Sequence, residues 1–219
     1  MLHQGRACRG ERRTTQHYVL ENLVRDVRGR GNRVTAGDVG FHYVAMSLWL
    51  ANRGDVVYDM MTQDAGPGYV YQLKHGATSL TEAWDTNPAS SQNHCMLGHI
   101  EEWLYLGLAG ISSAACGFKE IAICPEVVGD LTWVKADHRS MYGKIASQWR
   151  RDCDRLTLDV TIPANTTAQV HVPAKDAGSV TESGEPAAKA KGVKFLHMAK
   201  DAATYEIGSG TYHFTSQLP

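Results

Sequence analysis

The first half of the chain carries apolar residues at helical spacing. Between residues 18 and 28, apolar side chains recur three and four positions apart and form one face of a predicted helix, which Gly29 ends. The same spacing predicts further helices over residues 41–52, 56–62 and 99–108. The segment between the last two, residues 64–92, is rich in Gly, Pro, Ser and Asn. A loop of that length inside a helical layer is typical of a functional site.

The second half alternates between apolar and polar residues. Along residues 155–162, every second residue is apolar, so one face of a strand is buried and the other meets solvent. Short runs of this kind predict strands over residues 119–124, 130–136, 143–149, 155–162, 168–172, 193–197, 204–207 and 211–214, with a shorter one at 179–182. Such a series predicts an antiparallel β-sandwich, with Trp133 and Trp149 in its core. The predicted fold class is therefore α+β with more than one domain.

Charge argues against several classes of partner. The chain has 22 Lys and Arg against 23 Asp and Glu, so no overall field attracts nucleic acid or an anionic membrane. The first 33 residues hold eight Arg, from Arg6 to Arg33, which leaves a nucleic-acid-binding arm as an alternative. Tyr18 is the only aromatic residue among them, so a solvated arm, or a start inside a longer reading frame, is preferred. We predict neither a nucleic-acid partner nor a membrane partner.

The sequence predicts no metal site and no cofactor. The five cysteines include no C-x-x-C pair, so neither a zinc knuckle nor a disulfide framework is indicated. His94 and His99 are five residues apart, whereas two metal ligands on one helix face are spaced by four, and no acids have calcium-loop spacing. No apolar run has the length of a membrane span, and the first 15 residues lack the apolar centre of a secretory signal. The cytoplasm is the default expectation unless a signal lies upstream.

The segment GATSLTEAWD, residues 76–85, holds the candidate chemistry. Glu82 stands there beside Trp84, and His94 follows in SQNHC. Sugar sites commonly combine an aromatic face, which covers the apolar side of a pyranose ring, with a carboxylate and an imidazole that reach its hydroxyls or the attacking water. The pattern favours carbohydrate hydrolysis. From the residues alone, Glu82 is also compatible with an exposed loop acid, His94 with a buried structural histidine and Trp84 with simple core packing.

Three further residues are weaker candidates. Asp38, in the Gly-Asp-Val-Gly turn before the predicted helix over residues 41–52, could cap that helix or line a pocket, and we favour the cap. Tyr69 and Tyr71 are candidates for a pocket wall.

The chain resembles the C-terminal part of bacterial α-L-rhamnosidases. The runs that carry the resemblance are TAGDVGFHYV (35–44), PGYVYQLKHGATSLTEAWD (67–85) and NHCMLGHIEEWLYLGLAGI (93–111). The later segments GFKEIAICP, GDLTWVKADH, YGKIASQW, LTLDVTIPANTTAQVHVP and IGSGTYHF resemble the β-sandwich that ends those enzymes. The matches follow one another in order from residue 18 to residue 214.

The resemblance implies a domain order and a mechanism. After a basic arm (residues 1–17), residues 18–112 would supply the last helices of an (α/α)6 barrel, and residues 113–219 a β-sandwich. The family is expected to remove terminal α-L-rhamnose from glycosides or polysaccharides with inversion. The resemblance assigns the general base to Glu82 and a contact with the bound rhamnose to His94.

The resemblance also leaves a catalytic group unaccounted for. The family's general acid lies upstream of the matched part, and nothing before Thr35 resembles that segment. We therefore expect a fragment that is inactive or weakly active by itself. The alternative is a non-catalytic carbohydrate-binding β-sandwich. A lyase or phosphorylase with the same barrel would require substrate motifs that the sequence does not show.

Overall fold

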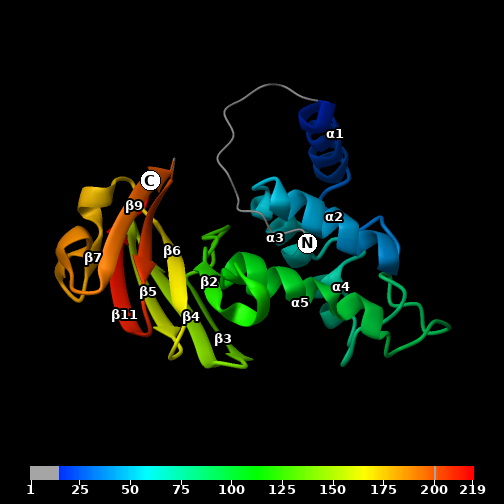
Figure 1. The fold of residues 1–219 in the computed structure, drawn as a ribbon. Helices are drawn as coiled ribbons and strands as arrows, with labels where there is room; N and C mark the ends of the chain where they lie inside the picture. Colours follow the sequence, from blue (N-terminus) through cyan, green and yellow to red (C-terminus); the bar gives the residue numbers. More distant parts are fainter. Residues whose placement is uncertain (1–14, 200) are drawn as a thin grey trace. The chain divides into compact units, whose positions relative to one another are not determined.

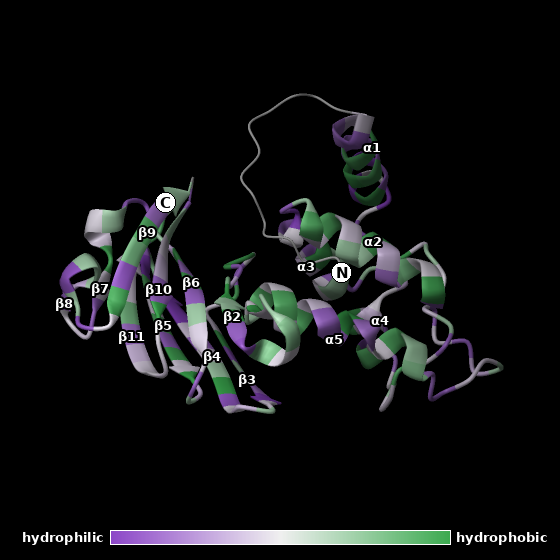
Figure 2. Ribbon diagram, viewed as in Figure 1, coloured by the Kyte–Doolittle hydropathy of each residue, from purple (hydrophilic) through white to green (hydrophobic). Residues whose placement is uncertain are grey.

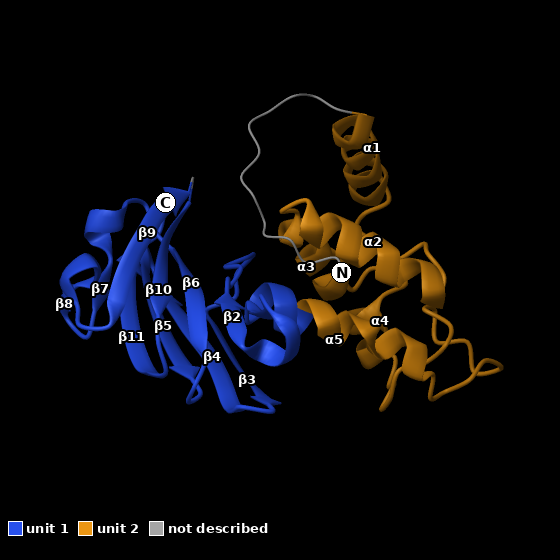
Figure 3. Cartoon of the chain, viewed as in Figure 1, with its two compact units in different colours: residues 1–8, 104–219 blue, residues 9–103 orange. Residues whose placement is uncertain are grey.

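A computed structural model describes residues 15–199 and 201–219. Most of the predicted basic arm, residues 1–17, lies outside the described residues. The described residues form two compact units, a helical unit (residues 15–103) and a β unit (residues 104–199 and 201–219), which Figure 3 colours separately. Helices followed by a β-sandwich are the predicted architecture, and that prediction is confirmed.

The helical unit contains the predicted helices, apart from the end of the last one, and one more helix. Its helices are α1 (Thr15–Gly29), α2 (Asp38–Leu50), α3 (Gly54–Thr62), α4 (Tyr69–Lys74) and α5 (Ile100–Trp103), with a 3-10 turn at Cys95–His99 (Figure 1). The predicted helix over residues 99–108 combines parts of three kinds of helical turn, because a π-helical turn (Leu104–Leu108) follows α5. Within the described ranges, no helix is both long and apolar enough to cross a lipid bilayer.

Helix α4 corrects the prediction of one continuous loop over residues 64–92. It has six residues, too few for a helical repeat to stand out among the surrounding Gly and Pro residues. The helix ends in a Schellman motif: the N–H of Gly76 donates to the carbonyl of Leu73 at 3.1 Å, and the N–H of Ala77 to that of Gln72 at 3.0 Å. Gly76 adopts a φ of 85°, a left-handed conformation that glycine tolerates best. The chain therefore turns sharply into the loop that carries Glu82.

Helix α2 is apolar on more than one face. Phe41 and Leu48 are fully buried in the core of the helical unit. Val39, Tyr43 and Leu50 lie on the same helix and are 53%, 66% and 61% exposed. A helix that is hydrophobic all round is typical of the interior of a large protein. The helical unit thus covers only part of the apolar surface of α2.

The β unit consists of two sheets. One has the order β1 (Ile111–Ser113), β2 (Glu120–Ile123), β6 (Thr167–Pro173), β10 (Ala202–Ile207), β9 (Val193–Ala199). The other has the order β3 (Trp133–Ser140), β4 (Gly143–Asp152), β5 (Arg155–Ile162), β11 (Gly210–Gln217), β7 (Thr181–Glu182), β8 (Glu185–Pro186). All pairs are antiparallel except β2 with β6, which is parallel, so the sandwich is mostly rather than wholly antiparallel.

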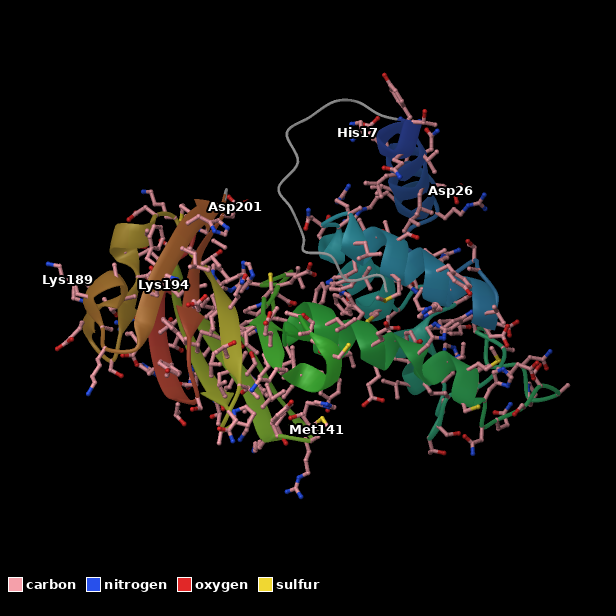
Figure 4. All side chains as sticks on the ribbon, in the orientation of Figure 1. His17, Asp26, Met141, Lys189, Lys194 and Asp201 are labelled. Carbon is pink, nitrogen blue, oxygen red and sulfur yellow. The ribbon has the colours of Figure 1, made fainter. Side chains whose placement is uncertain are left out.

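Alternating side chains from both sheets fill the core of the β unit. Figure 2 shows hydrophilic and hydrophobic residues alternating along β5, whose apolar residues are buried. Trp149 on β4 is fully buried as predicted, and its Nε1 donates to the carbonyl of Leu108 at 2.8 Å. Trp133 on β3 is 64% exposed, so its predicted core position is wrong. Its neighbour Val134 packs against the core, and adjacent residues of a strand face opposite sides. Met141, between β3 and β4, also points outward (Figure 4).

Candidate functional site

Glu82 lies exposed in the loop that follows α4. Its backbone N–H donates to the carbonyl of Ser91 at 2.9 Å, and its Oε2 accepts from the N–H of Ser91 at 3.1 Å. The residue is therefore bonded twice to one residue across the loop. These bonds give the carboxylate a defined direction while leaving it accessible to solvent.

The same loop brings the segment of Glu82 next to the segment of His94. The N–H of His94 donates to the carbonyl of Leu80 at 2.7 Å, and the hydroxyl of Ser79 donates to the carbonyl of Gln92. Together with the Glu82–Ser91 bonds, these contacts hold residues 79–82 beside residues 91–94. Two of the predicted site residues thus share one hydrogen-bonded loop.

His94 forms a pair with Asp38 at the start of α2. The distance between His94 Nε2 and Asp38 Oδ2 is 2.9 Å, and Asp38 Oδ1 accepts from the N–H of Val39 at 2.9 Å. The hydrogen bond from His94, followed by that from Val39, lowers the pKa of the Asp38 carboxyl below its ordinary value. Asp38 is the first residue of α2, and the N-cap is Gly37, so our preferred prediction of a capping role is wrong. From the first position of the helix, the side chain of Asp38 contacts both the N–H of Val39 and the ring of His94.

Trp84 and Tyr69 belong to an aromatic cluster around Phe41. Their rings meet edge to face at a centroid distance of 5.1 Å, and that of Trp84 lies 5.3 Å from the ring of Phe41. Trp84 is 9% exposed and donates from Nε1 to the carbonyl of Ala36 at 3.0 Å. The hydroxyl of Tyr69 donates to the carbonyl of Leu97 at 2.6 Å, and burial raises its pKa. These contacts position both rings within the helical unit, and any contact with sugar stays a prediction.

Tyr71, the second tyrosine of α4, lies apart from this cluster. Its ring stacks on that of His75 at a centroid distance of 3.9 Å, and the carbonyl of Tyr71 contacts His75 Nδ1 at 2.8 Å. Both of these contacts are local to the end of α4.

A hollow of about 510 Å³ opens beside the Asp38–His94 pair. It is lined by residues of α2 and of the 3-10 turn: Asp38, Val39, His42, Tyr43, Cys95, Met96, Gly98 and His99. Of the predicted site residues, only Asp38 is among them. Its size suits a small ligand, and its walls combine apolar side chains with a carboxylate and two imidazoles.

His42 and His99 supply the two imidazoles of this hollow, and neither was predicted as a ligand-binding residue. Their rings lie 5.3 Å apart, edge to face, and His42 Nδ1 lies 3.7 Å from Glu102 Oε2. Burial lowers the pKa of His99, which favours a neutral ring at pH 7. The spacing of Asp38 and His42, four residues apart on one helix, was the signal that could have found His42. Across the described parts of the chain, no cluster of three or more His, Cys, Asp or Glu side chains is arranged to hold a metal ion.

This arrangement supports two kinds of chemistry. Glu82 is a solvent-accessible carboxylate that can accept a proton from water. The Asp38–His94 pair offers a polar group of fixed orientation for a hydroxyl-bearing ligand. Neither function requires a cofactor.

Two family models match consecutive parts of the chain and leave residues 188–219 unmatched. One, for the bacterial α-L-rhamnosidase six-hairpin glycosidase domain, matches residues 11–108, and the other, for the bacterial α-L-rhamnosidase C-terminal domain, matches residues 110–187. A helical glycosidase domain followed by a β domain is thus the class to which the fold points. The chain belongs to the bacterial α-L-rhamnosidase family and corresponds to the C-terminal region of its members.

Individual relatives agree with this placement. An α-L-rhamnosidase of Streptomyces avermitilis is 26% identical over 204 residues, which cover 89% of this chain and 19% of that protein. An α-L-rhamnosidase of Formosa agariphila is 28% identical over 206 residues, which cover 90% of this chain and 22% of that protein. The chain therefore spans about a fifth of the curated relatives that it matches.

Solved structures extend the likeness to the fold. The α-L-rhamnosidase of Dictyoglumus thermophilum has a TM-score of 0.85 at 27% identity, covering 95% of this chain and 24% of that one. The Streptomyces avermitilis enzyme, solved in complex with L-rhamnose, has a TM-score of 0.81 at 26% identity, covering 90% of this chain and 19% of that one.

Proposed function

We propose that this chain is the C-terminal part of an inverting α-L-rhamnosidase, in which Glu82 is the general base. The observation that carries the proposal is the exposed carboxylate of Glu82, oriented by backbone bonds in a loop shared with His94. The names of the relatives supply the substrate class, a glycoside or polysaccharide with terminal α-L-rhamnose. We assign the general acid to a segment outside this chain, because the family segment that carries it is not matched.

The proposed reaction is a single displacement. Glu82 takes a proton from a water molecule, and the resulting oxygen nucleophile forms a bond to the anomeric carbon of rhamnose. The glycosidic bond breaks at the same time, and the general acid gives its proton to the leaving oxygen. The two carboxyl groups of inverting glycosidases are about 6.5–9.5 Å apart, which leaves room for the water. The first product is therefore β-L-rhamnose.

His94 is assigned to the bound sugar. With Nε2 donating to Asp38, an imidazole in its neutral form presents Nδ1 as an acceptor for a sugar hydroxyl. The carboxylate of Asp38 thereby fixes both the tautomer and the direction of the ring.

The test uses a longer form of the protein that hydrolyses an aryl α-L-rhamnoside. Removing a positioned base costs about 10²–10⁴-fold in turnover, so Glu82→Gln should lose that much. Glu101→Gln, a change at an exposed glutamate of the same unit, is the matched control and should retain full turnover. Proton NMR of the first product should show the β anomer. Undiminished turnover in Glu82→Gln, or a first product with the α configuration, contradicts the proposal.

A second function rests on Trp133. A solvent-facing indole on a sandwich is a surface on which a sugar ring can stack, and the exposure of Trp133 favours the alternative of a non-catalytic carbohydrate-binding module. Arg150 lies opposite Trp133 on β4 and is also exposed. Saturable binding of a rhamnose-containing oligosaccharide by the chain, retained in Glu82→Gln and lost in Trp133→Ala, would support this function. Binding that Trp133→Ala leaves unchanged would exclude it.

A further inference from the structure

Gln72 is a buried polar residue behind the loop that carries Glu82. It lies on α4 and is 2% exposed. Its Nε2 donates to the carbonyl of Thr81 at 3.1 Å and to that of Ala83 at 3.4 Å. Both partners are carbonyl oxygens, so only the amide nitrogen of Gln72 can make these bonds. The side chain of Gln72 thus holds the backbone immediately before and after Glu82.

The backbone of Gln72 also holds the start of this loop. Its carbonyl accepts from the N–H of His75 at 3.2 Å and from that of Ala77 at 3.0 Å, within the motif that ends α4. One residue therefore fixes the point where the loop begins and the point where the candidate base sits. A buried amide is costly unless it is hydrogen-bonded, which gives these contacts a strict geometry.

Other hydrogen bonds of the loop also hold the backbone around Glu82. The hydroxyl of Thr81, which is 2% exposed, donates to the carbonyl of Ala83 at 3.0 Å. Ala83 therefore receives bonds from Gln72 and from Thr81 on one carbonyl oxygen. The opposite side of the loop is held by the Glu82–Ser91 bonds. The backbone at Glu82 is thus fixed from the buried side by Gln72 and from the exposed side by Ser91.

We propose that Gln72 is a positioning residue for Glu82: it fixes the backbone on both sides of the base, and through it the direction of the carboxylate. This inference rests on the proposed role of Glu82 as general base. Gln72 makes no bond to the side chain of Glu82, so it acts through the loop. Misplacement of a catalytic group by about 1 Å can cost about 10²-fold in rate, which makes such a support consequential.

The chain offers a matched control on the neighbouring turn. Gln63 Nε2 donates to the carbonyls of Gly66 and Pro67, at 3.3 and 2.9 Å, so this residue has the same chemistry but holds a different segment. Gln63→Leu and Gln72→Leu remove the same kind of contact. If only Gln72→Leu changes the Glu82 loop, the effect comes from the contacts that Gln72 makes there. It does not come from the loss of a side-chain amide in general.

The first measurement is amide hydrogen exchange of the chain, which does not depend on activity. Loss of these buried hydrogen bonds should make exchange about 10–100-fold faster at the amides that depend on them. Gln72→Leu should produce such a change at the amides of Glu82, Ser91 and His94, while Gln63→Leu leaves them unchanged. Unchanged exchange at these amides in Gln72→Leu overturns the proposal. Amides in the middle of α2 report whether each variant is folded.

Gln72→Glu provides a test within a single variant, in case the leucine variant does not fold. A protonated carboxyl can donate to one of the two carbonyls, whereas a carboxylate can only repel them. Exchange at the amide of Glu82, relative to wild type at the same pH, should therefore be near normal at acid pH and faster at alkaline pH. A ratio that does not change with pH overturns the proposal.

The second measurement is turnover of an aryl α-L-rhamnoside by an active longer form of the protein. Gln72→Leu should lower kcat by about 10–100-fold with little change in KM, and Gln63→Leu should alter neither. If Glu82→Gln is inactive but Gln72→Leu retains full kcat, the positioning role is overturned and the function stands. If Glu82→Gln retains full turnover, the proposed function is overturned. The exchange measurements then still decide whether Gln72 holds the loop.

Discussion

The two units of the chain differ in how many large apolar side chains they expose to solvent. In the described part of the β unit, three large apolar side chains are exposed: Trp133, Met141 and Phe195. The smaller helical unit exposes seven in its described part: Tyr18, Val19, Val39, Tyr43, Leu50, Leu73 and Met96. The sandwich thus closes its own core between two sheets, whereas the helical unit presents apolar side chains on α1, α2, α4 and the 3-10 turn. This difference is what a complete module beside a portion of a larger helical domain would show.

The two units should differ most when they are expressed separately. Residues 104–219 expressed alone should unfold in one cooperative transition, because their core is formed within the unit. Residues 15–103 alone should bind a hydrophobic dye and unfold broadly, because apolar surface on α2 remains uncovered. Thermal unfolding by circular dichroism and dye fluorescence measure both. A cooperative, dye-free transition of residues 15–103 as a monomer would contradict the comparison.

Substitutions of large aromatic residues should affect the stability of the two units differently. Trp149→Ala removes a fully buried ring and its bond to the carbonyl of Leu108, and should destabilise the β unit by about 3–5 kcal/mol. Tyr43→Ala removes a ring that is 66% exposed, and should change the stability of the helical unit by about 0.5 kcal/mol or less. Urea unfolding of each variant gives the two values. Equal losses would show that Tyr43 is packed in solution.

A smaller effect is expected from low pH, which should reduce the stability of the helical unit. Hydrogen bonds from His94, Arg53 and Lys74 lower the pKa of the carboxyl groups of Asp38, Asp55 and Asp64, respectively. A lowered pKa favours the ionised form in the folded state. Its contribution to stability is complete above the ordinary value of 3.8 and is lost as the pH falls through the lowered one.

The helical unit should therefore lose stability as the pH falls below about 4. Residue-resolved hydrogen exchange at several pH values measures this loss, and amides on β5 serve as the internal reference. The triple variant Asp38→Asn, Asp55→Asn, Asp64→Asn should show a weaker dependence on pH over this range. A helical unit whose stability is constant down to pH 2 would contradict the assignment.

The sequence predicted the β unit well where one strand face is buried and the other exposed. Strand β5 has the predicted bounds, residues 155–162, because its apolar and polar residues alternate without interruption. Trp133 was misplaced because a large apolar residue at the start of an edge strand says little about which face it occupies. The sequence thus located the strand but not the direction of its first side chain.

The sequence suggested residues for the candidate site but not the contacts that hold them. Glu82 and His94 stood out through local composition and a family resemblance. The contact of Asp38 with His94 joins residues 56 positions apart, and no periodicity reports such a contact. The bonds of Gln72 depend on the turn at the end of α4, a helix too short to be seen in the sequence. Long-range contacts of this kind follow from tertiary structure alone.

We propose that this chain carries the base but not the acid of an α-L-rhamnosidase. The most direct measurement is hydrolysis of an aryl α-L-rhamnoside by the purified chain, with its Glu82→Gln variant assayed beside it. We predict no turnover above that of the variant. Turnover that exceeds the variant would show that a second acid within these 219 residues completes the site, and would contradict the claim.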